Sequence, residues 1–178
     1  MRRLLTLGGA LLVVGALITA PSAHAGTSMR DWVPDSQLAP YRALASQYTD
    51  PSQLGTGWGE VIDVDGISCI ADPAGSGAMG VHFANVSRIV DGTVDPRQPE
   101  AAVYEPRAHG SLHLVALEYI VFESAWGPTP PELFPGHPFM LTDAPNRFGL
   151  PAFWSQHVWI GKGNPDGNLA MWNPNVHC

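Results

Sequence analysis

The chain has 178 residues, of which 45% are hydrophobic and 14% charged. This composition excludes intrinsic disorder of the kind caused by high charge and low hydrophobicity. Its length suits one domain. Sixteen acidic residues outnumber nine basic ones. Because a phosphate backbone would repel so acidic a chain, general nucleic-acid binding is excluded as well.

The first 25 residues have the composition of an export signal. Arg2 and Arg3 precede an uncharged apolar stretch at 4–20, and Ala23-His24-Ala25 supplies the small residues that a signal peptidase requires. A membrane anchor is the alternative, but the cleavage pattern favours removal. We therefore predict a signal peptide at 1–25 and a single secreted, extracellular domain at 26–178, with no membrane attachment after cleavage. That domain has seven basic and sixteen acidic residues, a formal net charge of −9.

The chain has two cysteines, Cys69 and Cys178. In an exported protein an even cysteine count usually means a disulfide, because the compartment is oxidising. The alternative is a thiol that binds a metal or acts as a nucleophile. We predict a Cys69–Cys178 disulfide that closes a long loop and holds the C-terminus.

After the signal, the first predicted element is a helix near residues 36–48. Apolar residues recur there at helical spacing: Leu38, Tyr41, Leu44, Ala45 and Tyr48. Residues 60–70 alternate like two strands joined at Asp65-Gly66, which predicts a hairpin.

The following segments are predicted to be mostly strand. Apolar runs at 79–86, 101–105, 111–123 and 152–161 have strand character, and 106–110 joins the second and third as a hairpin loop. Seven prolines between Gly127 and Pro151 oppose regular structure there, and loops of that length are often functional. We predict a β-rich α+β domain with a mainly antiparallel sheet, or a small barrel or sandwich, and a short N-terminal helix.

Glu118 lies in the middle of the apolar strand 111–123. Strand alternation places Leu112, Leu114, Ala116, Ile120 and Phe122 on its face, and the opposite face is apolar too. An isolated buried carboxylate is costly, so Glu118 must be neutralised, paired or bound to a metal. Burial would also raise its pKa, which suits a catalytic acid or base. A protonated or arginine-paired structural glutamate is the alternative.

His82 and His157 lie in similar apolar strands. Gly80 and Ala84 leave space beside His82, while Ser155 and Trp159 flank His157. Two imidazoles and one carboxylate match the ligands of open zinc sites and of non-haem iron enzymes. We predict that His82, Glu118 and His157 hold a divalent transition metal such as zinc, iron, copper or manganese, with Glu118 as the catalytic residue. A closed hydrogen-bond network without a ligand is the alternative.

The remaining histidines give weaker signals. His137 lies in the proline-rich segment, where it could be a fourth ligand or a proton shuttle, although a surface position is favoured. His113 is expected to face away from Glu118 and to pack against other residues.

Six tryptophans suggest a different class of function, a secreted protein that binds without catalysis. Exposed, coplanar rings could form a platform for a carbohydrate or a protein partner. Trp154 and Trp159 have opposite parity on one strand, so they cannot share a face. Core packing is the simpler explanation.

Four sequence segments resemble a group of secreted bacterial proteins that have no assigned activity. They are MGVHF, VDPRQPEAAVYEP, LVALEY and HVWIGKGNPDGNLAMWNPNVHC, and the resemblance covers about residues 66–178. It carries a histidine in the first segment, a glutamate in the third and a terminal cysteine. The resemblance implies that His82, Glu118 and His157 belong together, and it implies no reaction.

Together these observations predict an exported domain with a metal site of two histidines and one glutamate. Such a domain could act as a metal-dependent enzyme, whose reaction the sequence does not define. Its partner would be a small molecule or a carbohydrate.

Overall fold

The computed structural model describes residues 31–178, so the predicted signal peptide at 1–25 lies outside the described residues. Its helical elements are α1 (Asp35–Ala45), η2 (Ser46–Tyr48), η3 (Pro51–Gln53), α2 (Val86–Ile89), η4 (Ala108–Gly110) and α3 (Glu123–Trp126). Its strands are β1 (Trp58–Glu60), β2 (Cys69–Ala71), β3 (Ala78–Asn85), β4 (Ala101–Pro106), β5 (Leu112–Phe122), β6 (Glu132–Phe134), β7 (His137–Pro138), β8 (Met140–Thr142) and β9 (Phe153–Trp159).

Seven of these strands form one antiparallel sheet in the order β1-β3-β4-β5-β9-β8, with β2 paired to β3. The long central strands β4, β5 and β9 are buried along most of their length. Among the described strands the order ends at β1 and β8, so the sheet is open and does not close into a barrel. The predicted α+β class with a short N-terminal helix is confirmed.

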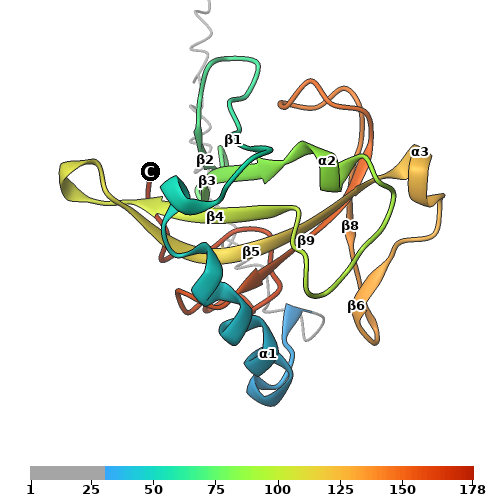
Figure 1. Cartoon of the computed structure of the whole chain (residues 1–178), viewed down its shortest axis with the longest axis horizontal. Helices are drawn as coiled ribbons and strands as arrows, with labels where there is room; N and C mark the ends of the chain where they lie inside the picture. Colours follow the sequence, from blue (N-terminus) through green and yellow to red (C-terminus); the bar gives the residue numbers. More distant parts are fainter. Residues whose placement is uncertain (1–30) are drawn as a thin grey trace, which may run out of the picture.

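Helix α1 covers one face of the sheet (Figure 1). Its buried residues Leu38, Tyr41 and Ala45 are the ones that recur at helical spacing in the sequence. They pack in one apolar cluster with side chains of β4, β5 and β9, including Tyr119 and Trp154. The amphipathic pattern therefore decides which side of the helix meets the sheet.

The opposite face of the sheet is covered by the C-terminal tail and by loops. Val176 packs with Ala116 and Trp159, and Asn173 exchanges two backbone hydrogen bonds with Ala78. The predicted disulfide between Cys69 and Cys178 is present and holds the end of the tail against β2. The loops at 61–68 and 143–150 rise on this side, away from α1 (Figure 1).

The hairpin predicted at residues 60–70 is wrong. β1 and β2 do not pair with each other; each pairs with β3, one with its second half and one with its first. The reason lies in the connecting turn, where Oδ1 of Asp63 accepts the N–H groups of Asp65 and Ile67. The segment therefore forms a compact loop, and its arms use the long free edge of β3.

The prediction that Leu112 and Leu114 share a face with Glu118 is also wrong. Both pack in the cluster beneath α1, on the side opposite Glu118. The register of β5 against β4 shifts at Val115, and such a bulge reverses the alternation of side chains beyond it. His113 is exposed rather than packed.

The proline-rich segment contains more strand than expected, because β6, β7 and β8 fall within it. All three are only two or three residues long. Within residues 31–178 no helix has the length and apolarity needed to cross a membrane.

Candidate metal centre

Strand register brings His82, Glu118 and His157 to one point on the face away from α1. Glu118 on β5 lies directly opposite His157 on β9. On its other side Glu118 pairs with Ala101 of β4, which in turn pairs with Ala84 of β3. His82 lies two residues before Ala84, so it reaches the same point diagonally, across two alanines that leave room for its ring.

The three side chains approach one another through the atoms that bind metals. Nε2 of His82 lies 3.5 Å from Oε2 of Glu118, and Nε2 of His157 lies 3.7 Å from Oε1. The two Nε2 atoms are 3.5 Å apart. Each imidazole thus faces a different carboxylate oxygen. Among the described residues, this is the group of histidine, cysteine and carboxylate side chains whose geometry could hold a metal ion.

These separations fit a shared ion better than direct hydrogen bonds. Hydrogen bonds from a ring nitrogen are usually about 2.7–3.2 Å long, so all three contacts are long for a closed network. Ligands at ~2.0–2.2 Å from one ion lie about 3–4 Å from one another. The convergence that a metal site requires is therefore present, and the closed hydrogen-bond network is the poorer account of the geometry.

Burial sets the charge state of the group. The three side chains are 3–5% exposed. Burial raises the pKa of Glu118 to about 8 and lowers the pKa of His82 to about 4; it lowers the pKa of His157 as well. Without an ion, the group therefore favours a neutral carboxyl and two neutral imidazoles. Neutral imidazole is the form that binds metals, and a cation would favour the carboxylate.

Neighbouring residues orient the three side chains. Ser155 hydrogen-bonds to Glu118 and opposes the rise of its pKa. The ring of His157 stacks on that of Trp159 at 5.5 Å with an interplanar angle of 11°. The Gly80 backbone opposes the fall in the pKa of His82, but Nδ1 of His82 has no hydrogen bond of normal geometry and is buried.

Residue 80, two positions before His82, must be a glycine. Its φ of +114° is accessible mainly to glycine, and an added Cβ would lie 2.4 Å from the carbonyl oxygen of Tyr104. The glycine thus lets β3 approach β4 closely beneath the imidazole.

Two pockets reach the group. One contains His82 and Glu118 among mainly apolar side chains. The other contains His157 and lies beside β8 and the tail. Ser155 and Met171 line both pockets, so the group lies between them.

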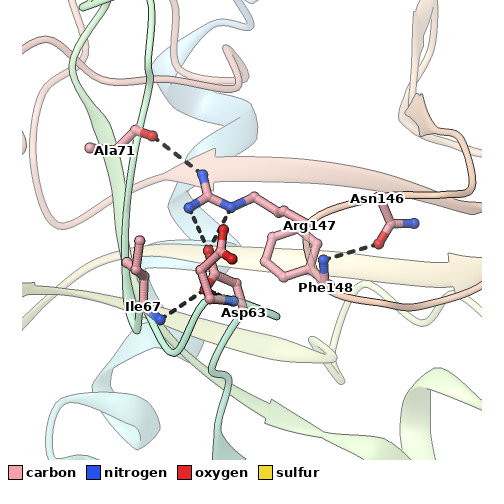
Figure 2. Close-up of polar contacts among 7 residues, drawn as sticks. Asp63, Ile67, Ala71, Asn146, Arg147 and Phe148 are labelled. Carbon is pink, nitrogen blue, oxygen red and sulfur yellow. Dashed lines mark hydrogen bonds and ion pairs between the residues drawn. The ribbon is translucent and has the colours of Figure 1, made fainter.

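An ion pair fixes one wall of the first pocket. Nε and Nη2 of Arg147 donate to Oδ2 of Asp63 at 3.1 and 2.7 Å, and Nη1 donates to the carbonyl of Ala71 (Figure 2). The Val64 N–H also donates to the carbonyl of Arg147. These bonds join the loop at 143–150 to the loop at 61–68. Nothing in the sequence pattern indicated this pair, since 84 residues separate its members.

Other predicted features do not join the centre. His137 is in β7 and is not a member of the convergent group. Trp154 and Trp159 are buried on opposite faces, as their parity predicts. Trp32 and Trp126 are exposed, and no ring contact joins them within residues 31–178. The tryptophan platform therefore has less support than the metal centre.

Comparison with protein-family models, curated proteins and solved structures found no match to the chain. The arguments on function therefore rest on the centre and its surroundings.

A second buried glutamate gives the fold a pH dependence. Glu100 is 2% exposed, accepts the Ile120 N–H through Oε2, and has its pKa raised by burial to about 8. The folded state therefore binds this proton more tightly than the unfolded state. We expect stability to fall as pH rises from about 4.5 through 8. Glu100→Gln, which keeps an acceptor for Ile120, should remove on the order of 2–4 kcal/mol of that fall in urea titrations. An unchanged pH profile would contradict this assignment.

Proposed function

We propose that the chain is an exported, metal-dependent enzyme in which His82, Glu118 and His157 hold one divalent transition metal ion. The observation that carries the proposal is the convergence of three side chains, each from a different strand, in a buried site. The two imidazole Nε2 atoms are 3.5 Å apart, and each lies 3.5–3.7 Å from one oxygen of Glu118. Burying two imidazoles and a carboxylate together costs free energy that an ion would offset.

The donor set indicates which ions would bind. Two nitrogen ligands and one carboxylate suit zinc, iron(II), manganese or copper, whereas calcium and magnesium prefer oxygen ligands. Three protein ligands leave at least one coordination position open. Open positions are typical of catalytic sites, while structural zinc sites usually have four protein ligands.

When bound, such an ion acts as a Lewis acid that polarises a substrate oxygen or lowers the pKa of a bound water. The residues of the chain would then have distinct roles. Glu118 would serve as a ligand of the ion or as a base that accepts a proton, with the Ser155 hydroxyl orienting the carboxylate. Trp159 would fix the ring plane of His157. The apolar pocket would exclude water from the substrate.

Export is supported by the leader composition of residues 1–25 and by the disulfide. Disulfides persist in oxidising compartments and are rare in the cytosol. The resemblance to secreted bacterial proteins belongs to the same proposal.

Elemental analysis of protein purified without chelator or a histidine tag tests the metal. We expect about one equivalent in the wild type and less than a tenth of that in Glu118→Ala. The matched control is His113→Ala, because His113 lies on the same strand but is exposed and away from the centre. Metal lost equally in both variants, or no uptake of zinc, iron, copper or manganese by the wild type, would overturn the proposal.

A further inference from the structure

The pocket that contains His82 and Glu118 has a sharp separation of polar and apolar groups. Its polar side chains, within residues 31–178, are the two metal ligands and two hydroxyls, Thr142 and Ser155. The rest of the lining is apolar and comes from loops and strands far apart in the chain, among them Val61, Ile89, Phe148, Leu150, Phe153 and Met171.

This lining excludes several ligand classes. A sugar would leave most of its hydroxyls without partners, and buried unpaired polar groups are costly. A charge on the part of a ligand that lies along the wall would lack a counter-charge, since no lysine or arginine lines the pocket and Arg147 is paired with Asp63. Apolar surface, in contrast, is favourably removed from water there.

The positions of His82 and Glu118 in the pocket determine how a bound molecule would be oriented. His82 and Glu118 are each 5% exposed and therefore lie at the inner end, while Leu150 is 36% exposed and lies nearer the mouth. A bound molecule would place its one polar group beside His82 and Glu118 and its apolar part along the wall.

We propose that this pocket binds a small molecule with an uncharged apolar tail along the wall and a single metal-coordinating oxygen group at its inner end. The inference rests on the proposed function, because it names the class of substrate for that metal centre. The wall that contacts the apolar part includes Phe148 and Leu150, and the Asp63–Arg147 pair holds their loop in place (Figure 2).

Alkyl hydroxamates, which bind metals through oxygen, provide the test. Calorimetry on the zinc-loaded full protein would compare acetohydroxamate with hexanohydroxamate, which has four more methylenes. Each buried methylene is expected to raise affinity about threefold to fourfold, so a gain of roughly 100-fold is expected. Equal affinity for the two would overturn the proposal while leaving the metal centre intact.

Two variants locate the effect. Leu150→Glu, which introduces a charge at the pocket, should reduce the hexanohydroxamate gain at least tenfold without changing acetohydroxamate affinity. Leu141→Glu is the matched control, because Leu141 is equally exposed at 36% but does not line this pocket. An equal loss of the hexanohydroxamate gain in both variants would mean that the alkyl chain of the probe lies outside this pocket, and it would overturn the proposal.

A metal-free arm separates this inference from the proposed function. If the protein takes up no metal, the proposed enzyme fails, and the pocket is tested with 1-hexanol followed by amide chemical shifts. Saturable shifts at Phe148 and Leu150, weaker for 1,6-hexanediol, would support an apolar site. No saturable shift at these residues would overturn it.

Discussion

Replacing Cys69 and Cys178 together with serine is expected to lower the free energy of unfolding by about 4–5 kcal/mol. The disulfide spans 109 residues, and in the chain-entropy model a loop of that size restricts the unfolded chain by this amount. Domains are typically stable by only ~5–15 kcal/mol, so a large part of the total would be lost. For a domain of this size we expect the melting temperature to fall by roughly 10–20 °C.

The other contacts of the tail do not replace the disulfide. The buried Val176 and the Ala78–Asn173 backbone pair hold the tail in the folded state, but neither restricts the unfolded chain. Urea unfolding of the oxidised wild type, the double-serine variant and the reduced wild type measures the effect. The last two proteins lack the same bond and should agree within about 1 kcal/mol. A loss below 1 kcal/mol in both would show that the tail contacts suffice.

A saturating divalent metal is expected to raise the free energy of unfolding of the wild type by about 3–4 kcal/mol. This follows from linkage at a hundred- to thousand-fold excess over the dissociation constant, provided that the unfolded chain does not bind the ion. In Glu118→Gln, which keeps the size of the side chain, the stabilisation should be nearly absent. Glu100→Gln is the control, and it should keep the full effect because Glu100 is not a member of the centre.

Without metal, Glu118→Gln is expected to stabilise the protein at high pH. Burial raises the folded-state pKa of Glu118 to about 8, above its ordinary value near 4.5, so stability falls as pH rises through that interval. At pH 9 we expect metal-free Glu118→Gln to be more stable than the wild type by on the order of 2–5 kcal/mol. At pH 4.5 the two should be similar. A metal-free variant that is less stable at both pH values would mean that the carboxylate contributes stability through its contacts.

This reversal reflects a compromise between function and stability. A carboxylate in an apolar sheet is costly to the fold alone, and it becomes favourable when a cation neutralises it. With the proposed ion, the three buried side chains would resemble other functional sites, where groups that destabilise the empty fold are retained for binding.

Local patterns predicted several elements of this fold correctly. The helical spacing of Leu38, Tyr41 and Ala45 predicted both α1 and its buried side, because amphipathic periodicity is a property of a few turns. The apolar runs around Glu118 and His157 predicted β5 and β9 and the burial of both side chains. Their character as candidate ligands follows from residue type and burial alone.

Other features depend on which strands pair. Residues 60–70 alternate like a hairpin, but a long free edge of β3 accepts both arms, and alternation does not specify a partner. The bulge at Val115 has no signal in an uninterrupted apolar run, and it moved Leu114 to the other face. Short sequence windows contain no information about either competition.

The sequence by itself determined that two histidines and one glutamate would be buried in apolar strands, and that two cysteines would be available to pair. The tertiary structure alone decided that Glu118 lies opposite His157 and diagonal to His82, since that position requires the registers of β3, β4, β5 and β9 together. It also decided that Asp63 meets Arg147, across 84 residues, at the wall of the pocket. Local burial follows from hydrophobicity near each residue, whereas convergence depends on hydrogen-bond register summed over the whole sheet.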